Sequence, residues 1–185
     1  MLSKEKLRKK YINNRKKQYF ETKENCFKPL INFITRKQIK KISLYYPSNY
    51  EFDTLKLFQI LKKRDRTKTL LPIILKNNSM KFVSWKFSDP LMVNKFGFLE
   101  PEINGKKIIP DLILVPIVAF DKFKNRLGYG KGYYDRILSK YFLKNLNIIT
   151  IGLAFSFQKY KKIPTSNFDI KLDYVLTEKG IFKSK

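Results

Sequence analysis

Several short stretches of the sequence are apolar at almost every position, which is typical of strands buried on both faces of a sheet. Residues 111–115 read DLILV and residues 147–155 read NIITIGLAF. Stretches with helical spacing lie between such runs, as in residues 133–142, YYDRILSKYF. This alternation predicts an α/β fold with three α/β/α layers, in which a mainly parallel sheet carries helices on both faces in a Rossmann-like arrangement.

The same patterns predict the individual elements. Two helices are expected first, one to about residue 20 and one over about 23–40, with Pro29 in the first turn or at a kink of the second. Asp53 is expected to cap a third helix over the apolar residues 55–61. Strands are expected at residues 41–46, 69–75, 81–87, 111–115, 147–155 and 172–176. No linker rich in Ser, Gly or Pro divides the chain, so we expect residues 1–185 to form a single domain.

Missing residue types narrow the possible chemistry. The 185 residues contain no histidine and a single cysteine, Cys26. Catalytic triads with His, His metal ligands, an internal disulfide and a Cys-rich zinc site are therefore excluded. Catalysis has to use carboxylates, Lys, Arg, Tyr, main-chain amides or a hard cation held by oxygen. No apolar run approaches the roughly 18 residues of a spanning helix, and the basic N-terminus lacks the apolar segment of a signal peptide. We expect a cytoplasmic protein without a membrane partner.

The charge balance permits two interpretations. Forty Lys and Arg residues face 15 Asp and Glu residues, a net charge of +25. A nucleic-acid-binding protein is one interpretation, and it would need a clustered basic face. The lysines are spread along the whole chain and Asn and Ile are also plentiful, which favours a compositional bias. No RNP, zinc-finger or homeodomain pattern is present, so nucleic acid is kept only as the alternative partner.

A cluster of glycines is the clearest candidate for a binding site. Three of only seven glycines fall within residues 128–132, inside the sequence RLGYGKGYYDR. Glycine allows positive φ and close approach to the backbone, and exposed amides before a helix form an anion site. A tight turn explains one or two of these glycines, but not three interleaved with Arg, Lys and Tyr. The residues favour a phosphate or nucleotide loop, although no Lys-Ser or Lys-Thr closes it as in a Walker A loop.

Longer stretches resemble a known family. Residues 115–138, VPIVAFDKFKNRLGYGKGYYDRIL, resemble the signature of 5-formyltetrahydrofolate cyclo-ligases, also called methenyltetrahydrofolate synthetases. The sequences KEKLR at 4–8, the Glu-x-Asp-Thr at 51–54, GFLEP at 97–101 and residues 163–181 resemble further parts of the family in the same order. Departures are modest: Ile117 and Asn125 stand where Gly is common, although Asn tolerates a left-handed backbone.

The resemblance implies a reaction. A member of this family is expected to convert 5-formyltetrahydrofolate and ATP into 5,10-methenyltetrahydrofolate, ADP and phosphate, with Mg²⁺. Phosphorylation of the formyl oxygen would create a good leaving group, and N10 of the substrate would then close the ring. Phosphoryl transfer needs positioning and charge stabilisation rather than a protein nucleophile, so a protein without histidine can perform it. We expect a monomer with ATP and the reduced folate as its partners.

The resemblance also implies roles for residues. ATP would be bound by Lys4, Glu5, Lys6, Leu7, Arg8, Arg126, Leu127, Gly128, Tyr129, Gly130, Lys131, Gly132, Tyr133 and Tyr134. The reduced folate would be bound by Tyr46, Glu51, Tyr129, Gly130, Lys131, Gly132 and Tyr133. Catalysis would fall to Arg126, Lys131 and Tyr133. Asp135 and Asp169 would hold Mg²⁺, with Asp173 as a rival of Asp169. On this interpretation, Arg126→Ala and Asp135→Asn are expected to lose activity while the protein stays folded.

Several of these residues also fit plain structural roles. Without the resemblance, Lys4 and Arg8, four positions apart on one helix face, would be a solvated basic surface. Glu51 would be an acidic residue at a helix start, and Asp135 an acid that the helix dipole favours. Tyr46 fits a buried strand equally well. Trp85 is expected in the core or on the surface, and Glu100 is expected to pack the Glu-Pro turn.

Overall fold

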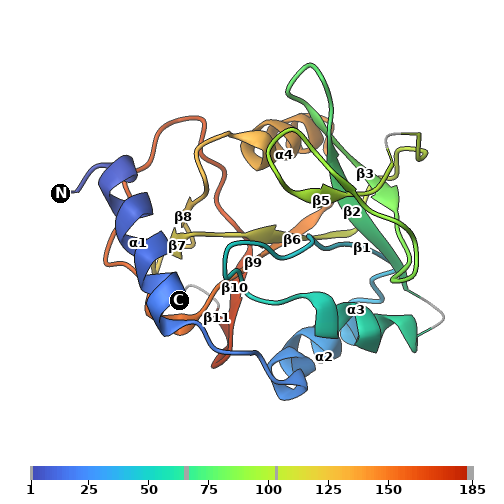
Figure 1. The fold of residues 1–185 in the computed structure, drawn as a ribbon, viewed down its shortest axis with the longest axis horizontal. Coiled ribbons are helices and arrows are strands. Elements are labelled where there is room, and N and C mark those ends of the chain that lie inside the picture. Colours follow the sequence, from blue (N-terminus) through green and yellow to red (C-terminus); the bar gives the residue numbers. More distant parts are fainter. Residues whose placement is uncertain (1, 65–66, 103, 183–185) are drawn as a thin grey trace.

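A seven-stranded sheet forms the centre of the protein (Figure 1). The computed structural model describes residues 2–64, 67–102 and 104–182. The strand order is β11-β10-β9-β6-β1-β2-β3. Five neighbouring strands run parallel: β10 (Tyr174–Thr177), β9 (Ile149–Leu153), β6 (Leu112–Pro116), β1 (Lys41–Ser43) and β2 (Lys68–Ile74). The edge strands β3 (Met80–Ser84) and β11 (Gly180–Phe182) are antiparallel to their neighbours. The predicted mainly parallel sheet is confirmed.

Helices cover both faces of this sheet. The helices α2 (Lys28–Arg36) and α3 (Leu55–Lys62) lie on one face and α4 (Tyr133–Leu143) on the other (Figure 1). In β6, Leu112 and Leu114 pack in the cluster that holds α2 and α3, whereas Ile113 and Val115 pack in the cluster that holds α4. Side chains alternate between faces along a strand, so an all-apolar strand buries both sides. The predicted three-layer arrangement is confirmed.

The first helix, α1 (Lys4–Gln18), lies beside one end of the sheet. It packs on the short hairpin of β7 (Ala119–Phe120) and β8 (Arg126–Leu127) through a third apolar cluster that contains Leu7 and Tyr11. Arg15 is the third buried residue of α1. These positions recur at the spacing of one helix face, so α1 turns Leu7, Tyr11 and Arg15 inwards.

Some element boundaries differ from those expected. The second N-terminal helix is divided into a 3₁₀ turn, η1 (Glu24–Phe27), and α2, with Pro29 in the first turn of α2. Asp53 accepts a hydrogen bond from the Leu55 amide at 2.8 Å, as a capping side chain does, although Thr54 occupies the N-cap position. Strands β1 and β3 end at Ser43 and Ser84, earlier than their apolar runs. Between β7 and β8 the left-handed residue is Lys124, with φ of 64°, and not Asn125.

Among the described residues, six further short elements have no predicted counterpart. They are β4 (Met92–Val93), β5 (Leu99–Glu100), the two strands of the β7–β8 hairpin and the turn η2 (Ser156–Gln158), together with the edge strand β11. Strands of two residues are too short to show alternation. The hairpins β4–β5 and β7–β8 flank the glycine-rich segment and shape the cavity described below.

Candidate active site

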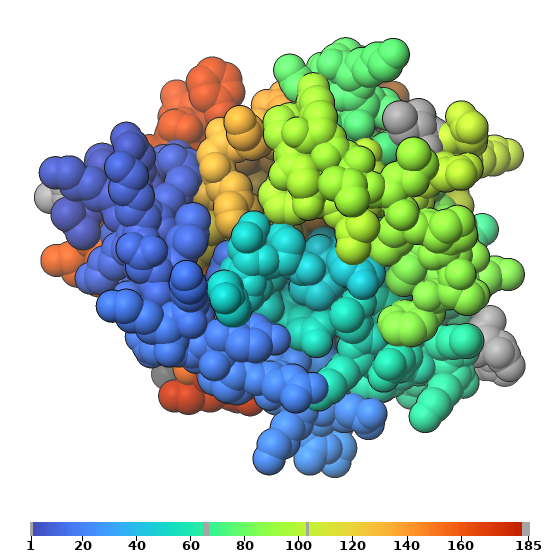
Figure 2. Space-filling model, viewed as in Figure 1, coloured from blue at the N-terminus to red at the C-terminus, as the bar shows by residue number. Residues whose placement is uncertain are grey.

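A cavity of about 690 Å³ lies beyond the carboxyl ends of the parallel strands. Tyr45 and Tyr46, which follow β1, Ile74 at the end of β2 and Pro116 at the end of β6 all line it. This is the expected place for a ligand in an open α/β sheet. Figure 2 shows the surface hollowed between α1 (blue), the segment after β1 (cyan) and the β4–β5 hairpin (yellow-green).

The glycine loop (residues 128–132) runs from β8 to the start of α4 along this cavity. Gly130 and Gly132 have φ of 95° and 68°, a backbone conformation that side chains disfavour. A Cβ atom at Gly132 would lie 2.9 Å from Nη1 of Arg136, and one at Gly130 would lie 3.2 Å from Cζ of Arg8. The positive φ therefore favours glycine at both positions, and a guanidinium group lies against each of them.

Basic residues and two carboxylates gather at one end of the cavity. Nζ of Lys4 lies 2.5 Å from Oδ2 of Asp169, and Nη2 of Arg126 lies 2.5 Å from Oδ1 of Asp135. Arg126 also donates to the main-chain oxygen of Ile170, whose amide donates to Asp135 at 3.1 Å. Arg8 donates from Nε to the Gly128 carbonyl at 2.9 Å. These contacts fasten α1, α4 and the segment at Asp169 around the glycine loop.

The guanidinium of Arg126 is almost enclosed, since only 5% of its side chain is exposed. Burial lowers the pKa of Arg126, and the charges of Asp135 and Asp169 oppose that effect. For Asp169, burial raises the pKa, but the hydrogen bonds from Lys4 and from Ser166 outweigh it and hold the pKa below its usual value. Asp169 is therefore an anion at neutral pH.

The two carboxylates leave oxygen atoms free to bind a cation. Asp135 uses Oδ1 for Arg126 and Ile170, and Asp169 uses Oδ2 for Lys4 and Ser166. Among the described residues, no hydrogen bond reaches the other oxygen of either carboxylate, and no three acidic, His or Cys side chains cluster as a closed metal site. Mg²⁺ is usually bound by one or two carboxylates plus waters and phosphate oxygens, so this donor set fits Mg²⁺ beside a phosphate.

A buried carboxylate occupies the other end of the cavity. Glu51 is 6% exposed and accepts hydrogen bonds from the Tyr129 hydroxyl at 2.6 Å and from the Ser48 amide at 2.9 Å. Burial raises the pKa of Glu51, and the hydrogen bonds and the positive charge of Arg15 oppose this. Arg15 donates from Nη2 to the same Tyr129 hydroxyl at 2.6 Å. No sequence pattern marks Arg15, because it lies within a run of basic residues.

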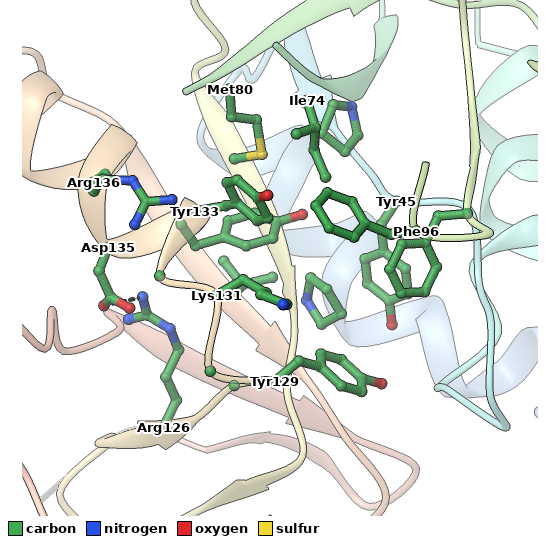
Figure 3. Close-up of a pocket in the computed structure, with 18 of the residues that line it drawn as sticks. Tyr45, Ile74, Met80, Phe96, Arg126, Tyr129, Lys131, Tyr133, Asp135 and Arg136 are labelled. Carbon is green, nitrogen blue, oxygen red and sulfur yellow. Dashed lines mark hydrogen bonds and ion pairs between the residues drawn. The ribbon is translucent and has the colours of Figure 1, made fainter. Parts of the chain in front are cut away.

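Apolar side chains form the wall between these ends. Figure 3 shows Arg126, Asp135 and Arg136 on one side of the cavity, Tyr45 and Phe96 on the other, and Lys131 between them. Ile74, Met80, Phe96 and Phe98 complete the wall. The Lys131 ammonium lies 5.5 Å from the centre of the Phe96 ring. Sequence reasoning missed these residues, because 16 Phe residues are spread through the chain and no pattern marks Phe96 or Phe98.

Most residues proposed for the site from the sequence meet in this cavity. Lys4, Arg8, Tyr46, Glu51, Arg126, Asp135, Asp169 and all of residues 127–134 line it. Three members of the ATP set do not. Glu5 and Lys6 are exposed on α1, and Leu7 is fully buried in the apolar cluster under α1, so their side chains do not reach the cavity.

The structure also locates the residues for which the sequence left two roles open. Asp173 accepts hydrogen bonds from the Thr150 amide and hydroxyl, both at 2.8 Å, and does not line the cavity, which leaves Asp169 as the candidate. Trp85 is 2% exposed and packs in the core against Phe58. Glu100 accepts from the Ile74 amide and from Asn94, and so fixes the β4–β5 hairpin to β2.

One polar atom in the cavity wall has no partner. The Tyr134 hydroxyl is buried and forms no hydrogen bond with any described residue, although Tyr134 lines the cavity. Burial raises the pKa of Tyr134 far above its usual range, with a further contribution from Glu51. A buried hydroxyl without a partner is costly, so this neutral donor is a candidate to meet a ligand.

The fold and the site together define an α/β enzyme for small molecules, with a glycine loop and cationic side chains at one end of a cavity and an apolar chamber with a buried carboxylate at the other. The chain belongs to the 5-formyltetrahydrofolate cyclo-ligase family, whose sequence profile matches residues 2–178, and it is therefore a ligase. None of the described helices is long and apolar enough to cross a bilayer.

Individual relatives and solved structures agree with this assignment. The 5-formyltetrahydrofolate cyclo-ligase of Haemophilus influenzae is 32% identical over 86% of this chain and 87% of its own, and that of Mycoplasma genitalium is 32% identical over 92% and 91%. The 5,10-methenyltetrahydrofolate synthetase of Aquifex aeolicus superposes with a TM-score of 0.77 at 32% identity, covering 98% of this chain and 93% of its own. The synthetase of Mycoplasma pneumoniae has a TM-score of 0.75 at 26% identity over 96% and 99%.

Proposed function

We propose that this protein converts 5-formyltetrahydrofolate and ATP into 5,10-methenyltetrahydrofolate, ADP and phosphate, with Mg²⁺. The observation that carries the proposal is the glycine loop, which lies in one cavity between a cationic end and an apolar chamber. A loop in this position can hold the phosphates of ATP on its cationic side and the ring system of the second substrate on its apolar side. The names of the relatives and solved structures support this substrate and this product.

The cationic end would bind the triphosphate. Amides of the glycine loop at the start of α4 are suited to phosphate oxygens, and Lys4, Arg8 and Lys131 line the same part of the cavity. Arg126 has two of its nitrogens engaged with Asp135 and Ile170, so its main role would be to position Asp135. Asp135 and Asp169 would hold Mg²⁺, which when bound would neutralise charge on the phosphates.

The apolar chamber would bind the reduced folate. Ile74, Met80, Phe96 and Tyr46 offer flat and flexible apolar surfaces for a ring. Glu51 keeps acceptor capacity beyond its bonds from Tyr129 and Ser48, because a carboxylate has about four lone-pair positions. A pterin carries several N–H donors, and a buried carboxylate would fix its orientation.

The reaction then depends on how the two substrates are positioned, and it does not need a covalent intermediate with the protein. The formyl oxygen would attack the γ-phosphorus, the bond to the bridging oxygen would break, and ADP would leave. N10 would attack the activated carbon, the carbon–oxygen bond would break, and phosphate would depart with the N10 proton. Lys131 would stabilise charge on the transferred group, and Tyr133 with the unpartnered Tyr134 hydroxyl would orient it.

Four broader expectations stay predictions. The seven-stranded sheet draws its strands from residues 41 to 182, which supports one cyclo-ligase domain over residues 1–185. The other three are a cytoplasmic location, a monomeric state and nucleic acid as the alternative partner.

A coupled assay tests the proposal. Purified protein, ATP, Mg²⁺ and 5-formyltetrahydrofolate should produce the absorbance of the methenyl product together with one ADP per product. Lys131→Met should lower kcat/KM by about 100-fold. Lys140→Met, which changes an exposed lysine on α4, the helix that follows the glycine loop, should not change it. Absence of turnover by the folded wild-type protein, or equal rates in Lys131→Met and wild type, would contradict the proposal.

A further inference from the structure

Arg15 is a buried cation without a counter-charge in direct contact. Its exposure is 1%, and among the described residues no carboxylate lies within ion-pair distance of it. Its Nε atom is buried without a hydrogen-bond partner in the same part of the chain. Its contacts are the hydrogen bond to the Tyr129 hydroxyl and a position 5.5 Å from the centre of the Tyr129 ring. Burying a charge in this way opposes folding, so its presence calls for another reason.

The reason follows from the donor properties of the guanidinium group. Arginine carries N–H donors only and stays protonated, so the Tyr129 oxygen must accept from Arg15. The single Tyr129 hydrogen is then directed to the Glu51 oxygen 2.6 Å away. The Ser48 amide donates to the other Glu51 oxygen. The direction of the whole chain of hydrogen bonds is fixed by Arg15, and it presents Glu51 as an acceptor.

We propose that Arg15 is a positioning residue for the reduced folate: through Tyr129 it orients Glu51 as an acceptor towards the N–H donors of the ring. The inference rests on the proposed function, in which Glu51 binds that ring. Arg15 does not line the cavity and would not touch the substrate. It would affect substrate binding indirectly, through residues that line the cavity.

The electrostatics around Glu51 agree with this role. Burial raises the pKa of Glu51, and the positive charge of Arg15 opposes this effect. The hydroxyls of Tyr45, Tyr129 and Tyr134 also face Glu51, and burial raises their own pKa values. Those three groups stay neutral at physiological pH and cannot replace the positive charge. Removal of Arg15 is therefore expected to raise the pKa of Glu51 further.

The test compares Arg15→Met, Arg15→Lys and wild type in steady-state kinetics, with Lys16→Met as the matched control. Lys16 is the exposed neighbour on α1, and its substitution removes the same charge. Arg15→Met should raise the KM for 5-formyltetrahydrofolate by about 10-fold, change the KM for ATP and kcat by less than about threefold, and move the acidic limb of kcat/KM to higher pH. Arg15→Lys should recover part of both effects, and Lys16→Met should match wild type.

Two further measurements separate positioning from a structural role. Because Arg15 is buried and incompletely paired, Arg15→Met should unfold at an equal or higher denaturant concentration than wild type, so the kinetic defect should occur in a protein that is no less stable. In a Tyr129→Phe background, Arg15→Met should raise the folate KM by less than about twofold more. If wild type is active but Arg15→Met keeps its folate KM and pH profile, or its defect is undiminished in the Tyr129→Phe background, the inference is wrong. Inactive wild-type protein would instead overturn the proposed function on which it depends.

Discussion

Arg126 and Asp135 are joined by a contact of 2.5 Å between Nη2 and Oδ1, which ties the last strand before the glycine loop to the first turn of the helix after it. The loop between them is thereby held at both ends. The same Asp135 oxygen and the same guanidinium also bind the main chain of Ile170. One ion pair therefore fixes the loop and the neighbouring segment that carries Asp169.

This geometry changes one expectation from the sequence. Arg126→Ala should destabilise the fold, because it leaves a partly buried carboxylate and a carbonyl without their partner. We predict a loss of about 3 kcal/mol in the free energy of unfolding, measured by urea denaturation. Lys41→Ala, which breaks the more exposed pair with Asp111, should cost less than about 1 kcal/mol. Similar losses for both variants would contradict the buried pairing of Arg126.

Asp135→Asn is the cleaner test of the catalytic role. The amide oxygen of Asn can still accept from Arg126 and Ile170, so the variant should remain folded, while the negative charge proposed to bind Mg²⁺ is gone. We predict a loss of about 100-fold or more in kcat/KM and a higher Mg²⁺ requirement. Asp173→Asn, which alters a carboxylate outside the cavity, should keep the Mg²⁺ dependence of wild type. Unchanged Mg²⁺ dependence in Asp135→Asn would remove Asp135 from the metal site.

The glycine loop yields a prediction about stability. Gly132→Ala places a Cβ at a φ of 68° and 2.9 Å from Arg136, and should cost about 1–2 kcal/mol. Gly128→Ala has open space and no positive φ, so its cost should be near zero. Thermal denaturation of both variants measures the difference. Equal melting temperatures would mean that the backbone at Gly132 is not constrained as described.

Glu51 is expected to reduce stability at neutral pH. Burial raises its folded-state pKa above the ordinary value of 4.5, so the folded protein holds the Glu51 proton more tightly than the unfolded chain does. As pH rises from about 4.5 through the raised pKa, the folded state must ionise a buried group and this contribution to stability is lost. Glu51→Gln should therefore be more stable than wild type at pH 7, with the advantage shrinking as the pH falls below that window. The same variant should bind the folate weakly, and a stability gap independent of pH would contradict the assignment.

The apolar wall of the cavity leads to a prediction about how the folate is bound. Phe96→Ala should raise the KM for 5-formyltetrahydrofolate by about 10-fold, because a ring loses an aromatic contact, and leave the KM for ATP nearly unchanged. Phe123→Ala is the control, since Phe123 is 46% exposed and lies outside the cavity. Parallel changes in both KM values for Phe96→Ala would indicate that the wall does not bind the folate.

The sequence predicted the fold where elements are long and buried on both faces. Strands β6 and β9 are apolar at almost every position because each face of the sheet carries a helix layer, and the amino-acid sequence alone shows this pattern. The hairpins β4–β5 and β7–β8 have strands of two residues. Their shape comes from side-chain contacts such as Asp121 accepting from the amides of Phe123, Asn125 and Ile163, which no local periodicity records.

The candidate site was predictable where its residues are adjacent in the sequence. The clustered glycines with Arg126, Lys131 and Asp135 form one segment, so composition and resemblance both indicated it. Arg15 and Phe96 reach the site from elements that only the tertiary fold brings together. Leu7 shows the opposite case. It belongs to a contiguous helical segment that the resemblance assigns to ATP, but its side chain packs in the core, because every turn of a helix directs some side chains inwards.

An oxygen-transfer experiment tests the central claim most directly. If the glycine loop holds a triphosphate against the formyl group in one cavity, the formyl oxygen itself becomes part of the released phosphate. Substrate labelled with a heavy oxygen isotope in its formyl group, converted in a single turnover and followed by mass spectrometry of the products, should give phosphate that carries the label. Unlabelled phosphate, with the label in water, would show that the formyl oxygen is not phosphorylated and would contradict the account.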